Sequence, residues 1–372
     1  MKAFFIALAM LAMATVNGQG KRMILEKSNA ATPIKNQGRT GTCWSFSTTS
    51  LVESECLRKG MPAIDLSEMF TVRNIYMEKA KNYIRRQGSA RFDEGGLGHD
   101  VIRSMARYGI VPESAYSGLK AQAQLHNHSV MVGVLKNYLD SILKIKAPIP
   151  ENWAIQFSAI LDEYMGKAPT DFEYNGKTYT PLTFAKEVVK FDANDYVSLT
   201  SFTHHPFYQP FIVEVPDNFS NGAYYNLPLD ELTQVTKAAL KKGYTILWDT
   251  DVSNNGWAAS KGYAVLPPAD NAFEKDSINP DMTEGNYSQD TRQRLYEELV
   301  TEDDHLMHIT GIEKTPQGKT FFIVKNSWGL KSSPFEGYVH VSEPYFAINT
   351  VTVIVPKSAL DKSLRNKIAA SM

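Results

Sequence analysis

A cysteine at the start of a predicted helix is the residue of this sequence whose surroundings best suit covalent chemistry. Cys43 follows a loop that contains Gly38 and Gly41, and the chain from Trp44 to Lys59 has apolar residues near helical spacing. Cys43 is therefore expected in the first turn of a helix, where unpaired amides and the helix dipole favour the nucleophilic thiolate. Gln37, six residues upstream, could join the Cys43 amide in stabilising an oxyanion.

Two predicted strands in the last third of the chain could supply a general base. Residues 304–312 alternate as a strand does, and a second strand is predicted over residues 320–329, after a turn. An antiparallel hairpin of this kind places His305 near Asn326. The amide of Asn326 could then accept from one imidazole nitrogen while the other nitrogen faces Cys43.

His308 is the alternative base. It lies three residues after His305, so in a strand its side chain points to the opposite face, and we expect a packed or solvent-facing histidine. Trp328 follows Asn326 closely and is expected to screen the bond between His305 and Asn326 from water.

These segments together resemble the papain-like cysteine peptidases of family C1. The resemblance places Gln37 on the oxyanion glutamine, Cys43 on the nucleophile, His305 on the base and Asn326 on the orienting asparagine. Beyond these motifs the chain is similar to the bleomycin hydrolase and aminopeptidase C branch. The further matching stretches are residues 94–96, 108–113, 167–172, 180–182 and 248–252.

The resemblance implies an α+β, papain-like fold in which a helical lobe and a β-rich lobe enclose a catalytic cleft. Gly95 and Gly96 resemble the family's glycines that contact the substrate backbone, so together with Trp328 they are expected to bind substrate. The expected substrate is a peptide or protein, and no cofactor is implied. Known members of the branch suggest a homo-oligomer.

The resemblance favours an aminopeptidase, because in that branch a C-terminal arm lies in the cleft and admits only a substrate's free amino end. Here only residues 357–372 follow the last predicted strand. Leu360, Leu364 and Ile368 fall on one face of a short amphipathic helix, which leaves little chain to reach the cleft. A papain-like endopeptidase or oligopeptidase with an open cleft is therefore the alternative. A catalytically inactive binding module is a further one.

The order of elements predicts several segments. Residues 1–18 have the lysine and short apolar run of a secretory signal peptide, so a secreted or periplasmic protein is expected. The segments that follow are a helical lobe over 19–119, a helical insertion over 120–195, a β-rich lobe over 196–356 and a C-terminal tail over 357–372. Residues 251–290 are polar and are expected to form a long loop.

The composition argues against two classes of binding partner. The net charge of −1 over 372 residues provides no electrostatic footprint for nucleic acid or for an anionic membrane. Cys43 and Cys56 lie too far apart along one predicted helix for a disulfide, and Cys56 is expected in the core.

The remaining histidines are not expected to act in chemistry. His204 and His205 have no cysteine or carboxylate at ligand spacing, so no metal site is predicted. His126 and His128 are expected on the surface of the insertion helix.

Overall fold

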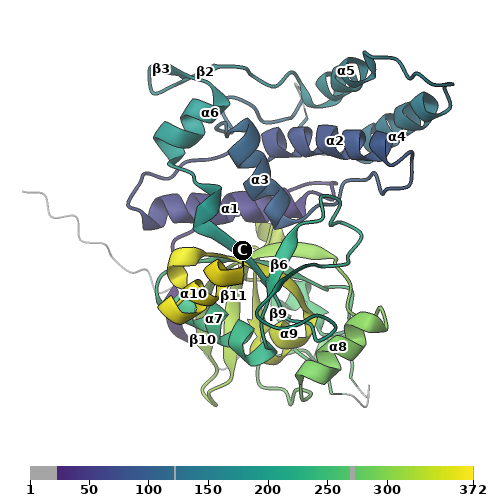
Figure 1. Cartoon of the computed structure of the whole chain (residues 1–372). Helices are drawn as coiled ribbons and strands as arrows, with labels where there is room; N and C mark the ends of the chain where they lie inside the picture. Colours follow the sequence, from purple (N-terminus) through teal and green to yellow (C-terminus); the bar gives the residue numbers. More distant parts are fainter. Residues whose placement is uncertain (1–22, 121–122, 269–272, 372) are drawn as a thin grey trace, which may run out of the picture.

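A computed structural model describes residues 23–120, 123–268 and 273–371. Helices form one lobe and a large sheet with its own helices forms the other (Figure 1). The helices of the first lobe are α1 (Cys43–Arg58), α2 (Glu68–Arg85), α3 (Gly98–Tyr108), α4 (Ser129–Leu143), α5 (Trp153–Met165) and α6 (Pro181–Phe184), with the hairpin β2 (Phe172–Tyr174) and β3 (Lys177–Tyr179). The predicted signal peptide, residues 1–18, lies outside the described residues.

The described residues of the second lobe and the N-terminal segment form an 11-stranded sheet in the order β5-β6-β4-β13-β7-β10-β11-β12-β9-β8, with β1 paired to β10. The strands are β1 (Ile24–Ser28), β4 (Tyr196–Thr200), β5 (Pro210–Ile212), β6 (Ala223–Asn226), β7 (Ile246–Thr250), β8 (Trp257–Ala258), β9 (Tyr263–Ala264), β10 (His305–Lys314), β11 (Thr320–Lys325), β12 (Tyr338–Ser342) and β13 (Thr350–Pro356). The helices of this lobe are α7 (Leu229–Lys241), α8 (Gln289–Glu297), α9 (Glu343–Asn349) and α10 (Lys362–Ser371).

Local signals in the sequence account for many of these elements. Ser67 caps α2 as its position suggests, because its hydroxyl accepts a 3.1 Å hydrogen bond from the Phe70 amide. The predicted hairpin of β10 and β11 is antiparallel, and β10 also pairs with β7. The expectation of a continuous loop over residues 251–290 is wrong, because β8 and β9 lie within it. These strands have two residues each, too short to give a periodic pattern.

The C-terminal tail is the predicted amphipathic helix. Leu360, Leu364 and Ile368 are buried in the core of the β-rich lobe, against residues of β4, β6 and α7. Ser371, the last described residue, lies near the hydroxyl of Tyr225 on β6, and its own hydroxyl donates to the Ile368 carbonyl at 2.9 Å. The tail therefore packs on the β-rich lobe (Figure 1).

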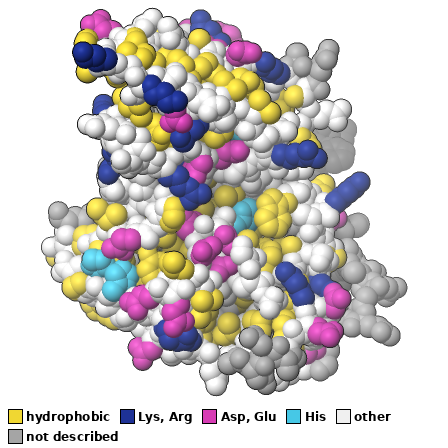
Figure 2. Space-filling view, turned by 90° about the vertical axis from the view of Figure 1, so that its right-hand side faces the viewer, with side chains coloured by type: hydrophobic (Ala, Val, Ile, Leu, Met, Phe, Trp, Pro, Cys, Tyr) yellow, Lys and Arg dark blue, Asp and Glu magenta, His cyan; other side chains and the backbone are white. Residues whose placement is uncertain are grey.

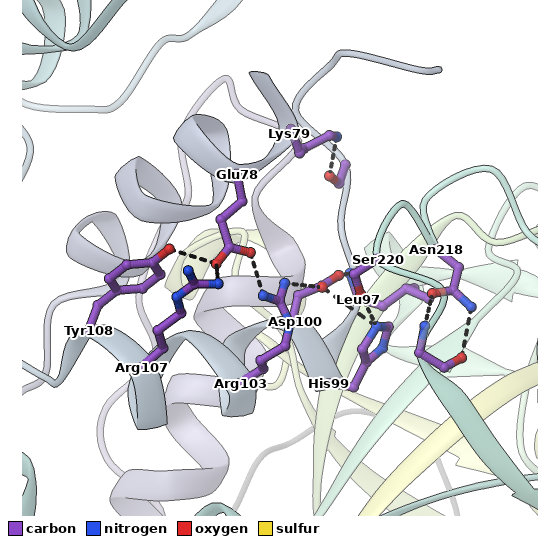
Figure 3. Close-up of polar contacts among 12 residues, drawn as sticks. Glu78, Lys79, Leu97, His99, Asp100, Arg103, Arg107, Tyr108, Asn218 and Ser220 are labelled. Atoms are coloured by element: carbon purple, nitrogen blue, oxygen red, sulfur yellow. Dashed lines mark hydrogen bonds and ion pairs between the residues drawn. The ribbon is translucent and has the colours of Figure 1, made fainter. Parts of the chain in front are cut away.

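Polar contacts join the two lobes beside α3 (Figure 3). His99 in the first turn of α3 contacts the Tyr224 hydroxyl at 2.7 Å through Nδ1 and the Ser220 hydroxyl at 2.9 Å through Nε2. Asn218 closes the same loop, since its amide nitrogen donates to the carbonyl oxygens of Val213 at 2.9 Å and Gly222 at 3.0 Å. The loop that precedes β6 is thereby fixed against the helical lobe.

Candidate active site

Cys43 is the first residue of α1, as predicted, and its side chain is 7% exposed. The loop before it depends on Gly38, which has φ of +70°, and a Cβ at that position would collide with the carbonyl of His126. The backbone amide of Leu306, the residue after His305, donates to the Cys43 sulfur. Helix α1 and strand β10 therefore bring the thiol beside the predicted base.

His305 opens β10, and Asn326 directly follows β11. The Asn326 side-chain oxygen lies 2.8 Å from His305 Nε2 and also accepts the Ser327 amide at 2.7 Å. The indole of Trp328 stacks on the imidazole, with ring centroids 4.5 Å apart. Because Nε2 is engaged by Asn326, Nδ1 remains for exchange with the thiol.

Gln37 is buried beside this pair. Its Oε1 accepts a 2.6 Å hydrogen bond from the Ser327 hydroxyl, and its Nε2 donates to the Thr40 carbonyl at 2.7 Å. An amide nitrogen carries two hydrogens, so one remains for a ligand. The Cys43 amide, at the start of α1, has no intrahelical acceptor. Two donors are thus held near the thiol.

The charge states differ from the expectation of a thiolate. Burial raises the pKa of the Cys43 thiol to about 12, and the carboxylates of Asp303, Asp249 and Asp217 add to that rise. Burial also lowers the pKa of His305 to about 4, against the opposing effect of its bond to Asn326. Both shifts disfavour the charged forms, so burial acts against the expected thiolate.

A cleft of about 450 Å³ opens at Cys43 and lies between the lobes. Gly95 and Gly96 line it, as expected from the sequence. A Cβ on Gly95 would collide with the Asp217 carboxylate, and one on Gly96 would lie 3.1 Å from the Trp44 indole. Figure 2 shows acidic side chains gathered where the surface is hollowed between the lobes.

Comparison with known proteins agrees with this geometry. The pattern of the Peptidase C1-like family matches residues 161–371, more than half of the chain, and that of the papain family cysteine proteases matches residues 22–139. The chain belongs to the Peptidase C1-like family. The crystal structure of PepW from Lactobacillus rhamnosis superposes with a TM-score of 0.71 at 21% identity, covering 93% of this chain and 84% of that one. The expected papain-like α+β fold is confirmed.

The relatives fall in the expected branch of the family. Aminopeptidase C of Streptococcus thermophilus is 24% identical, over 88% of this chain and 81% of its own length. Bleomycin hydrolase of Mus musculus is 22% identical, over 87% of this chain and 80% of its own length. The resemblance to the bleomycin hydrolase and aminopeptidase C branch is thereby confirmed.

Sequence reasoning missed the acidic residues of this C1-like cleft. Glu94 binds the nucleophile loop, because its carboxylate accepts the Gly41 amide at 2.7 Å and its carbonyl accepts the Trp44 indole at 2.9 Å. Asp217 and Asp303 also line the cleft. Asp303 precedes His305 by two residues and could have been noticed for that reason. Asp217 has no local signal, since only the packing of the lobes brings it here.

The other predicted free cysteine and the alternative base are both packed inside the protein. Cys43 and Cys56 are free thiols, and Cys56 is 2% exposed on α1. His308 is fully buried, and its Nδ1 lies 2.9 Å from the Ser50 hydroxyl. That contact joins His308 to α1, so His308 is the packed histidine that was one of its two expected states.

The surface location expected for His126 and His128 is wrong. Both precede α4, and residues 126–128 run beside the nucleophile loop, where the Arg39 amide donates to the His126 carbonyl at 2.8 Å. His128 is 4% exposed, and its Nδ1 lies 3.0 Å from the Tyr76 hydroxyl. Burial lowers the pKa of His126 to about 4 and that of His128 to about 3. The insertion therefore supports the active-site loop.

We expect His128 to make the fold sensitive to acid. The unfolded chain protonates this histidine below about pH 6.5, whereas the folded protein keeps it neutral until about pH 3. Its contribution to stability is present at pH 7 and is lost as the pH falls through this interval. Between pH 7 and pH 4.5 the free energy of unfolding should fall by about 2 to 3 kcal/mol more in the native protein than in His128→Asn. Urea unfolding at both pH values measures this, and equal losses would contradict it.

The sequence shows no carboxylate at ligand spacing from His204 and His205, but in the structure the Glu214 carboxylate contacts both histidines. That reason for predicting no metal site is therefore wrong. Glu214 lies 3.2 Å from Nε2 of each histidine, and the three ligand atoms lie within 4.8 Å of one another. However, the Gln293 amide nitrogen donates to His204 Nδ1 at 2.9 Å. This bond leaves the imidazole proton on Nε2, facing Glu214, which is a hydrogen-bonding arrangement rather than a metal-ligating one.

Proposed function

We propose that the protein is a cysteine aminopeptidase that hydrolyses the first peptide bond of peptide substrates. The observation that carries this proposal is the 2.8 Å bond between His305 and Asn326, which orients the imidazole next to Leu306, a residue that lines the same cleft as Cys43. The relatives named aminopeptidase C support the exopeptidase activity. No cofactor takes part in the proposed reaction.

In this mechanism the Cys43 sulfur attacks the scissile carbonyl carbon while its proton passes to His305. Gln37 and the Cys43 amide donate to the oxyanion that forms. The imidazolium, held by Asn326, then protonates the leaving amine as the C–N bond breaks. Water, deprotonated by His305, hydrolyses the thioester and regenerates the thiol. Gly95, Gly96 and Trp328 would bind the substrate beside these groups.

An endopeptidase or oligopeptidase is the second candidate, because the tail of the chain packs away from the cleft. Among the described residues, 357–371 contribute nothing to the cleft lining, and Ser371 lies near Tyr225 of the β-rich lobe. An inactive binding module is the remaining alternative, which labelling of Cys43 by an epoxide inhibitor would exclude.

One assay separates these candidates. An aminopeptidase should cleave an amino-acid amide with a free amine at least about 100-fold more efficiently than its N-acetyl form, which is about 3 kcal/mol of discrimination. Equal cleavage of both would instead indicate an endopeptidase. Deleting residues 369–372 should leave this ratio unchanged, because none of the described residues 357–371 lines the cleft. A gain of activity on the blocked substrate after the deletion would contradict that view of the tail.

We further propose that the protein is exported, with residues 1–18 as its signal peptide. Among the described residues, no helix has the length and apolar character needed to cross a bilayer. Its partners would then be peptides or proteins of the periplasm or the medium. Assembly into a homo-oligomer is a further proposal, which rests on the family resemblance of the sequence alone.

A further inference from the structure

Two carboxyl groups next to the catalytic residues face each other. Asp303 lines the cleft two residues before His305, and Asp249 on β7 is fully buried behind it. Burial raises the pKa of both carboxyls, and their contact with each other raises the pKa of Asp303 further while it opposes the rise at Asp249. Asp249 Oδ1 and Asp303 Oδ2 are buried atoms with no hydrogen-bond donor among the described residues. Because carboxylate oxygens only accept, such a contact requires a shared proton or a cation.

With one shared proton, the pair retains a single negative charge at the cleft wall. No lysine, arginine or histidine within the described ranges forms an ion pair with either carboxyl. Arg292 acts on Asp249 only at longer range, since its hydrogen bonds go to backbone carbonyls, including that of Ser201 at 2.7 Å. A buried charge without a counter-ion is costly, which makes the pair a receptor for a cation.

The neighbouring carboxylates of the cleft have a cationic or amide partner, although Oδ1 of Asp217 accepts no hydrogen bond among the described residues. Their partners are Lys79 at 2.7 Å for Asp93, Arg91 at 3.3 Å for Asp217, the Gly41 amide at 2.7 Å for Glu94, and the Ser253 amide at 3.0 Å for Asp304. Lys79 also donates to the carbonyl of Gly95 at 2.6 Å, and Asn218 holds the loop next to Asp217 (Figure 3). These contacts fix the cleft walls, and among the described residues they leave Asp303 as the cleft carboxyl that has neither an ion-pair nor an amide partner.

We propose that Asp303, backed by Asp249, binds the ammonium group of the peptide substrate beside Cys43. The proposal rests on the peptidase function above and deepens it. In a substrate's first residue the α-ammonium is separated from the scissile carbonyl carbon only by Cα. Asp303 lies two residues before His305 in the sequence and lines the same cleft as Cys43. An α-ammonium group bound to Asp303 would therefore leave the scissile carbonyl near the thiol. A lysine side chain offers the same chemistry from a second source.

Binding of a cation at this site would also assist the chemistry. Asp303 and Asp249 both raise the pKa of the Cys43 thiol, because their negative charge opposes a second negative charge on sulfur. An ammonium neutralises that charge and lowers the cost of forming the thiolate. Asp303 would therefore position a substrate that has a free amine, and the ammonium group of that substrate would help to activate the nucleophile. An N-blocked substrate would have neither effect.

The test uses Asp303→Asn, Asp249→Asn and the control Glu302→Gln, which removes an exposed charge adjacent in sequence and outside the cleft lining. Alanyl-coumarin amide with a free amine is compared with N-acetyl peptides that carry lysine or norleucine before the scissile bond. Asp303→Asn should lower kcat/KM on the free amine about 100-fold, and Asp249→Asn about 10-fold. Neither should change the norleucine peptide by more than about 3-fold, and Glu302→Gln should change no substrate.

A loss confined to the lysine peptide would support the site and assign it to a side-chain ammonium. Equal losses on charged and neutral substrates, or no loss, would overturn the proposal. Cys43 alkylation by epoxides with and without an ammonium group gives a readout that does not need turnover. Asp303→Asn should slow only the charged epoxide. If no peptide is cleaved by the native protein, the peptidase function fails, whereas cleavage without a charge-dependent effect of Asp303→Asn rejects this inference alone.

Discussion

Cys43→Ala is expected to lower kcat by about 10⁵-fold or more, because no other described thiol reaches the cleft. His305→Ala should lower kcat by about as much, since burial favours the protonated thiol and a base must then take its proton. The effects of the two substitutions on kcat should not be additive, because the nucleophile and the base act as one unit. Steady-state kinetics on a free-amine substrate measures both, with the native active sites titrated by an epoxide and the variants compared at equal concentrations of folded protein.

Two matched variants control this experiment. Cys56→Ala removes the other cysteine of α1 and should retain nearly native activity, because Cys56 packs against the Val189 carbonyl, far along the helix. Asn326→Ala should keep measurable turnover, since it loosens the imidazole and leaves it in place. An equal and complete loss in Cys56→Ala and Cys43→Ala would show that the assay reports damage to the fold rather than loss of the nucleophile.

Residues close together in sequence could be assigned from the sequence itself. Gln37 and Cys43 lie on one loop and the helix that it starts, and His305 and Asn326 lie on one hairpin. In each case a short segment with a clear period fixes the relative positions. The C-terminal helix was predictable for the same reason, because Leu364 and Ile368 are one helical turn apart.

Properties that arise only when the lobes pack were not predictable. The helix dipole at Cys43 is visible in the sequence, but the burial of Cys43 and the nearby charges of Asp217 and Asp249, which raise the pKa of the thiol, are not. His128 looked like a surface residue because nothing local shows that Tyr76 and the nucleophile loop would cover it. In both cases non-local desolvation outweighs a local signal.

Gln37→Ala is expected to lower kcat by about 10²- to 10³-fold with little change in KM, because an oxyanion donor acts in the transition state. In the native protein the Ser327 hydroxyl donates to Gln37 Oε1 at 2.6 Å, and the variant removes this acceptor. Displacement of the loop would then contribute to the loss of kcat. Ser327→Ala separates the two effects, since it removes this support and leaves the donor on Gln37. Ser327→Ala should lower kcat by about 10-fold at most. A Gln37→Ala variant with native kcat and a raised KM would instead assign Gln37 to ground-state binding.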